Sequence, residues 1–151
     1  MTGDEKQLRR AGEAGEADAM FGLAELLYHQ GLVALLPGRR RKRETEAEHW
    51  YRRAAGAGHG GAMGAVGRMC ARRRQFAEAE EWYRRAAEAG GPEAMIDIAL
   101  NFELDGKPVR AEQWYRRAAG DGTAMRSLAA LLEKQGRTAE AEQWYRWAAG
   151  R

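Results

Sequence analysis

The sequence has few residues that could cross-link the chain or ligate a metal. Cys70 is its one cysteine, and only three histidines and three prolines occur among 151 residues. A single cysteine excludes an internal disulfide and any metal site built from several cysteines. The spacing of the histidines puts no ligand pair on one helix face; they are His29, His49 and His59. We therefore expect neither a metal nor a cofactor.

Long apolar runs are also missing. The longest extends only from Leu32 to Leu36, which is far too short to cross a bilayer. The polar residues 1–7 show no secretory signal. Arginine outnumbers lysine by 21 to 4, beside 30 alanines, a bias typical of a GC-rich coding sequence. We therefore expect a bacterial, cytoplasmic protein without a membrane span.

What the sequence does contain is a pattern that occurs four times. Each copy holds Trp-Tyr-Arg between alanines, and the tryptophans are 32, 32 and 30 residues apart. The copies are Ala47–Ala55, Ala79–Ala87, Ala111–Ala119 and Ala141–Ala149. A second pattern lies before each copy and begins with Ala-Met, at Ala19, Ala62, Ala94 and Ala124. We call the two patterns the Trp-Tyr and the Ala-Met elements.

Both elements have the period of an amphipathic helix. In the first Trp-Tyr element, Ala47, Tyr51 and Ala54 follow the i, i+4, i+7 spacing of a buried stripe. The stripe of the last Ala-Met element is Met125, Leu128, Ala129 and Leu132. No segment alternates as a strand does, so we expect an all-α protein. The pair Thr45 and Glu48 reads as a capping box and predicts a helix start at Thr45.

Paired helices of about 30 residues fall within the size range of stacked repeats. The chain begins with half a repeat, because Leu8–Gly15 parallels Tyr83–Gly90. We expect one domain over residues 1–151. It consists of a half repeat over 4–15 and full repeats over about 17–59, 60–91, 92–121 and 122–151.

The pattern resembles a known family of helical repeats. The spacing of small and aromatic residues resembles the tetratricopeptide repeat. It is seen in the stripe Ala79, Tyr83 and Ala86 of one Trp-Tyr element and in the stripe of the Ala-Met element that follows. The phrase Trp-Tyr-Arg-Arg-Ala-Ala-x-x-Gly is similar to the Sel-one-like branch of that superfamily. One departure is that the glycine expected in the first helix occurs only as Gly67. The resemblance implies a right-handed α-solenoid of about four helical hairpins and a binding or scaffolding role, without catalysis.

The first candidate site is a second stripe on the Ala-Met helices, next to the buried one. The resemblance places this Ala-Met stripe on the concave surface, where it would bind a peptide through apolar anchors and charged groups. Its members are Phe21, Glu25, Tyr28, Arg68, Arg72, Ile96, Leu100, Glu103 and Arg126. Arg68 and Arg72 are one helical turn apart and suit an acidic group. The alternative is that these residues pack against neighbouring helices.

The second candidate is an insertion over residues 31–44 of the first full repeat. It contains the apolar run Leu32–Leu36, a turn at Pro37 and a basic loop of five consecutive residues, Arg39, Arg40, Arg41, Lys42 and Arg43. We expect Arg72–Arg74 to lie near this loop. RNA, DNA, an acidic protein or an anionic membrane surface would all suit such a charge. The alternative is a solvated, mobile loop, and the modest net charge of +3 weakens the nucleic-acid hypothesis.

The third candidate is the end of the last repeat. Trp147 stands where the other Trp-Tyr elements have arginine, so Trp144 and Trp147, with Leu131, could form an apolar surface for self-association. The alternative is that Trp147 covers the last core.

Catalysis has little support in the sequence. Glu48, Glu112 and Glu142 each precede an arginine by four residues and read as helix-surface ion pairs. Cys70 lies on a core stripe and is expected to be buried. We therefore expect a non-catalytic scaffold or adaptor with a protein or peptide partner. A basic regulator or nucleic-acid binder, and a self-assembling module, are the alternatives.

Overall fold

The computed structural model describes residues 1–150; Arg151, which ends the last expected repeat, lies outside them. These residues form helices and turns, without a strand among them. The helices are α1 Gly3–Glu13, α2 Ala17–Leu32, α3 Pro37–Gly56, α4 Gly60–Arg72, α5 Phe76–Leu104, α6 Pro108–Arg117, α7 Gly122–Lys134 and α8 Thr138–Ala148. The expected all-α class is confirmed.

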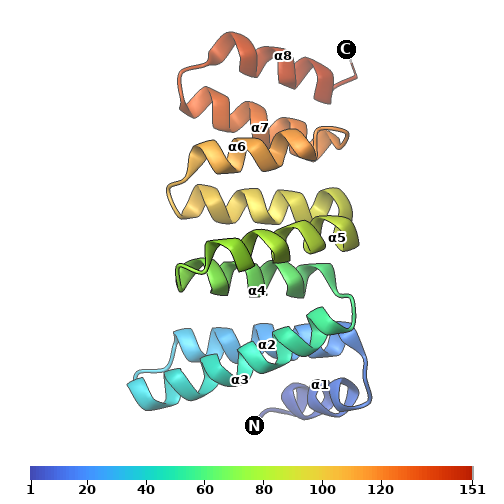
Figure 1. The fold of residues 1–151 in the computed structure, drawn as a ribbon, viewed down its shortest axis with the longest axis vertical. Helices are drawn as coiled ribbons and strands as arrows, with labels where there is room; N and C mark the ends of the chain where they lie inside the picture. The colour runs from blue at the N-terminus through green and yellow to red at the C-terminus, as the bar shows by residue number, and fades with distance from the viewer. Residues whose placement is uncertain (151) are drawn as a thin grey trace. The chain divides into compact units, whose positions relative to one another are not determined.

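The chain divides into two compact units, Met1–Ala89 and the part from Gly90 onward. In the first unit, α2 packs against α1 and α3, and α3 packs against α4 (Figure 1). In the second unit, α7 packs against α6 and α8. In both units, these consecutive helices are therefore also neighbours in space, which is the arrangement of helical hairpins.

The expected core stripes are buried. Ala47, Tyr51 and Ala54 of α3 are at most 3% exposed, and Leu128 and Leu132 of α7 are completely buried. The period of 3.6 residues per turn brings these side chains to one face, and burying them removes their apolar area from water. The repeats are therefore held together by the residues that recur in the sequence.

Gly91 interrupts α5. Its backbone angles, φ 60° and ψ −147°, are not helical, and they lie in a region that only glycine enters without strain. Pro92 follows directly and suits the first turn of the helical segment that begins after the interruption. The segments before and after Gly91 correspond to a Trp-Tyr and an Ala-Met element, and they belong to different units.

The expectation of a basic loop is wrong. Arg39–Arg43 are helical, because α3 begins at Pro37, eight residues before the expected start at Thr45. Proline is favoured in the first turn, and the arginine, lysine and glutamate residues that follow are good helix formers. Arg40 donates to Glu44 one turn later, at 2.9 Å. The Thr45 hydroxyl donates to the Arg41 carbonyl at 2.9 Å, inside the helix and not at a cap.

Candidate peptide-binding surface

In the first unit, part of the Ala-Met stripe is used for packing. The half-buried Phe21 ring stacks on His59, with ring centroids 4.3 Å apart, and lies 6.0 Å from the Tyr51 ring. Glu25 accepts a hydrogen bond of 2.6 Å from the Tyr51 hydroxyl. Burial and the neighbouring Glu25 carboxylate raise the pKa of Tyr51, so the hydroxyl stays protonated. Phe21 and Glu25 therefore hold α2, α3 and the start of α4 together.

Tyr28 and Arg72 form a different kind of pair. The exposed Arg72 side chain donates to the Tyr28 hydroxyl at 3.0 Å, and its guanidinium lies 5.8 Å from the centre of the Tyr28 ring. Within residues 1–150, no carboxylate contacts Arg72. The tyrosine thus orients a positive charge that has no anionic partner. Arg68, one turn earlier on α4, is half-buried and already engaged by its surroundings.

A cleft of about 410 Å³ adjoins this pair. Its lining comes from α2, α3, α4 and the residue after α4, and consists of Tyr28, Arg40, Arg41, Glu44, Thr45, Glu48, Met69, Arg72 and Arg73. Two of its arginines are neutralised by carboxylates, because Arg40 binds Glu44 and Arg73 binds Glu48. Among the described residues, no carboxylate contacts Arg41 or Arg72. The cleft therefore has a surplus of positive charge beside the aromatic face of Tyr28 and the thioether of Met69.

The second unit holds the rest of the stripe. Leu100 is 44% exposed, whereas Ile96 is half-buried. Glu103 accepts hydrogen bonds from the Tyr115 hydroxyl at 2.7 Å and from Lys134 at 3.2 Å. Arg126 is exposed, and in the described part of the chain it donates only to Thr123 on its own helix, at 3.3 Å. Within this unit, Leu100 and Arg126 are the stripe residues whose side chains are most accessible.

The expected proximity of Arg72–Arg74 to the basic segment is confirmed for Arg72 and Arg73, which share a cleft with Arg40 and Arg41. Arg43, in contrast, turns toward α1. It binds Glu5 at 3.3 Å, and Glu5 also accepts from Arg9 at 3.2 Å. Burial alone would raise the pKa of Glu5, but the two guanidinium groups outweigh it and lower the pKa. Arg43 therefore attaches α1 to α3.

At the end of the last repeat, Trp144 and Trp147 contact each other edge to face, with ring centroids 4.7 Å apart. Trp147 remains 46% exposed, while Leu131 is 3% exposed. The expectation that Leu131 contributes to an exposed end is wrong, because its side chain is buried. The apolar surface at this end comes from the tryptophans.

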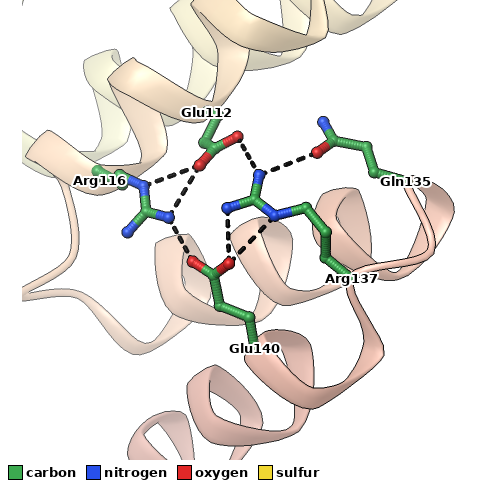
Figure 2. Close-up of polar contacts among 5 residues, drawn as sticks. All are labelled: Glu112, Arg116, Gln135, Arg137 and Glu140. Atoms are coloured by element: carbon green, nitrogen blue, oxygen red, sulfur yellow. Dashed lines mark hydrogen bonds and ion pairs between the residues drawn. The ribbon is translucent and has the colours of Figure 1, made fainter.

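Sequence reasoning found the helix-surface ion pairs but not the links between hairpins. Arg52 binds Glu48 at 3.2 Å and Arg116 binds Glu112 at 2.8 Å, as expected. Glu48 also binds Arg73, and Glu112 also binds Arg137. Figure 2 shows that Arg137 further contacts Glu140 and Gln135, and that Arg116 reaches Glu140 as well.

A signal for these links is present in the sequence. Arg73 and Arg137 are 64 residues apart, which is also the separation of Glu48 and Glu112. Each arginine lies in the turn after an Ala-Met helix and reaches back to the preceding Trp-Tyr helix. Hydrogen bonds from arginine lower the pKa of both glutamates. For Glu48 the hydrogen bond from Arg73 has the largest effect. For Glu112 burial has the largest single effect and would raise the pKa, but the hydrogen bonds and charges of Arg137 and Arg116 together outweigh it.

Residues 1–150 contain no group of three or more His, Cys, Asp or Glu side chains placed to hold a metal ion. Cys70 is completely buried, and burial raises the pKa of its thiol. In the described part of the chain, no helix combines the length and apolarity that crossing a bilayer requires.

Known proteins resemble the chain mainly in structure. No family model and no curated protein matches the sequence. A Sel1 repeat protein from Oxalobacter formigenes is similar over 97% of the chain, with 32% identity and a TM-score of 0.60, and the chain spans 63% of that protein.

Two further solved structures share the fold alone. pilF of Pseudomonas aeruginosa is similar over 98% of the chain, with 20% identity and a TM-score of 0.59, and the chain spans 69% of it. MamA is similar over 97% of the chain, with 16% identity and a TM-score of 0.56, and the chain spans 83% of it.

Proposed function

Because the chain folds into helical hairpins and is similar to a Sel1 repeat protein over 97% of its length, we propose that it is a non-catalytic protein-binding module of the tetratricopeptide and Sel-one-like repeat superfamily. Its proposed ligand is an extended peptide that carries a carboxylate next to an apolar side chain. The binding residues are those of the Ala-Met stripe that remain accessible in the first unit, above all Tyr28 and Arg72. Proteins of this superfamily are generally interaction scaffolds, which supports a binding role.

The observation that carries the proposal is the state of Arg72. Its guanidinium is exposed, held by the Tyr28 hydroxyl at 3.0 Å, and without a carboxylate partner in residues 1–150. An arginine that is oriented before binding loses little side-chain entropy when a ligand arrives. A guanidinium also binds a carboxylate through two parallel hydrogen bonds. The adjoining cleft supplies Arg41 as a second unneutralised charge and Met69 as an apolar contact.

The ligand chemistry follows from this lining. A carboxylate is favoured over a phosphorylated polymer because the cleft of about 410 Å³ is small and already contains two glutamates, Glu44 and Glu48. The carboxylate could belong to an Asp or Glu side chain or to a peptide C-terminus, since both present the same two oxygens. The Tyr28 ring and Met69 would receive the neighbouring apolar side chain.

A peptide-library selection tests the proposal. Two libraries of the same random sequences are used, one with free and one with amidated C-termini, and the affinities of the selected peptides are then measured by fluorescence polarisation. We expect the selected peptides to contain a carboxylate beside an apolar residue. Loss of a hydrogen bond to a charged group costs about 1.5–3 kcal/mol, so Arg72→Gln should weaken binding roughly tenfold or more.

Arg84→Gln is the matched control, because it removes another exposed arginine of the first unit that lies outside the cleft. The control should bind as the wild type does. Selected peptides without any carboxylate, or equal affinity of the Arg72→Gln variant and the wild type, would refute the proposal. Selection only from the library with free C-termini would identify the C-terminal carboxylate as the ligand group.

A further inference from the structure

The turn between α2 and α3 exposes a continuous apolar surface. Leu35 is 97% exposed, Val33 78%, Leu36 59% and Leu32 47%. Single exposed aliphatic residues are common, but four within five consecutive positions form a patch, and such patches mark interaction sites. In Figure 1 the turn is the tip at which α2 and α3 meet. The four exposed apolar residues therefore lie at the end of a hairpin.

Positive charge begins one helical turn after this tip. Arg39, Arg41 and Lys42 lie in the first turns of α3, and within residues 1–150 none of their side chains contacts a carboxylate. A helix rises about 1.5 Å per residue, so these cations lie roughly 5–9 Å along the axis from Leu36. The apolar tip and the unneutralised charges thus belong to one local surface.

A hollow of about 1130 Å³ lies beside the same charges, between α1 and α3. Arg39, Arg41 and Lys42 line it. Its two carboxylates, Glu5 and Glu46, are both bound by Arg9 and Arg43. The hollow therefore presents net positive charge to a ligand, and it is wide enough for a polar headgroup.

We propose that the α2–α3 tip docks the protein on an anionic lipid bilayer, with Leu32–Leu36 entering the interface and the cations of α3 binding lipid headgroups. Aliphatic side chains enter the boundary between headgroups and acyl chains, and nearby Lys and Arg add electrostatic attraction to anionic lipids. A nucleic acid would satisfy the charges but would leave the four aliphatic side chains in water. The bilayer is the partner that uses both parts of the surface.

Vesicle co-sedimentation with the full chain tests this proposal. The vesicles are phosphatidylcholine alone, or equal parts of phosphatidylcholine and phosphatidylserine. We expect binding to the mixed vesicles only. Arg39→Gln with Lys42→Gln should weaken this binding about 25-fold, because each cation near the surface contributes roughly fivefold. Val33→Gln with Leu35→Gln should weaken it at least about tenfold through lost apolar burial.

Matched controls separate the surface from general charge and from the proposed peptide site. Arg84→Gln with Arg146→Gln removes the same charge from exposed positions elsewhere, and Leu100→Gln removes another exposed leucine. Both should bind the mixed vesicles as the wild type does. Arg41 and Arg72 are left unchanged in all variants, so failure of this proposal and failure of peptide binding are distinguishable.

A second measurement reports insertion directly. Cys70 is completely buried, so Leu35→Cys provides one accessible thiol for an environment-sensitive fluorophore. Its emission should shift to the blue on the mixed vesicles.

Three outcomes would overturn the proposal. The first is absence of binding to the mixed vesicles. The second is binding that requires the cations but not Val33 and Leu35, accompanied by tighter binding to a random-sequence oligonucleotide, as expected of a nucleic-acid site. The third is a dimer in light scattering without lipid that Val33→Gln with Leu35→Gln abolishes, since a second copy would then cover the tip.

Discussion

Gly67 shows how one atom sets the distance between two helices. A Cβ at this position would lie 2.6 Å from the Tyr83 ring and 3.3 Å from the Ala79 carbonyl oxygen. Tyr83 is buried, so its ring has little room to move. Alanine occupies the matching positions of the other repeats, Ala24, Ala99 and Ala129. The requirement for glycine is therefore local to the contact between α4 and α5.

Gly67→Ala is expected to destabilise the protein by about 1–3 kcal/mol, the usual cost of overpacking a core. Gly64→Ala is the control in the same helix, because nothing lies within 4 Å of its added Cβ. That change should be neutral or stabilise by up to about 1 kcal/mol through helix propensity. Urea unfolding followed by circular dichroism measures both. Equal midpoints for the two variants would contradict the close approach of Gly67 to Tyr83.

At the scale of elements, the turn after an Ala-Met helix is tied to the Trp-Tyr helix before it. Glu112 of α6 binds both Arg116 on its own helix and Arg137 at the start of α8 (Figure 2). An isolated surface ion pair contributes about 0–1 kcal/mol, but a carboxylate shared by two arginines in a network contributes more. The network therefore adds to the packing of α7 against α6 and α8.

Glu112→Gln should lower the free energy of unfolding by roughly 1 kcal/mol or more, because two guanidinium groups lose their shared carboxylate. Glu142→Gln is the matched control, since among residues 1–150 Glu142 has an ion pair only with Arg146, at 3.9 Å, and both side chains are 71% exposed. The control should change stability by less than about 0.5 kcal/mol. Thermal melts at low and high salt measure the difference, which should shrink at high salt. If Glu142→Gln lowered the free energy of unfolding as much as Glu112→Gln does, the ion-pair network would not contribute to stability.

Helix positions could be predicted from the sequence because the apolar period depends only on local geometry. The start of α3 could not be predicted in this way. The sequence offers two possible starts, the capping-box pattern at Thr45 and Pro37, which is followed by helix-forming residues. Arg72 and Tyr28 were both expected in the binding stripe. Their hydrogen bond links residues 44 apart in sequence and depends on how α2 and α4 pack. Side-chain partners across helices follow from packing, which periodicity does not specify.

For the whole molecule, the ion-pair network predicts a dependence of stability on pH. Arg73 lowers the pKa of Glu48, and Arg116 and Arg137 lower that of Glu140. The ordinary pKa of a glutamate, 4.5, applies to the unfolded chain. A carboxyl whose pKa is lower than this in the folded protein stabilises the fold at pH values above 4.5. This stability is lost as the pH falls through the folded pKa.

The urea midpoint should therefore be constant near neutral pH and should fall as the pH decreases from about 5 towards 3. Glu48→Gln with Glu112→Gln should flatten this fall, because the variant lacks two of the groups that titrate. A midpoint that stays constant down to pH 3, or an equally steep fall in the double variant, would show that these glutamates do not govern acid stability.

The hydrogen bonds between tyrosine and glutamate determine where hairpins can be added to or removed from such a chain without loss of partners. Tyr51 with Glu25, Tyr115 with Glu103 and Tyr145 with Glu133 each join the two helices of one hairpin. Duplication or deletion of a complete hairpin carries hydroxyl and carboxylate together. A break inside the first or the second of these hairpins would separate the pair and leave the buried hydroxyl of Tyr51 or Tyr115 without its partner. Recombination in the turns between hairpins would thus keep each tyrosine with its glutamate.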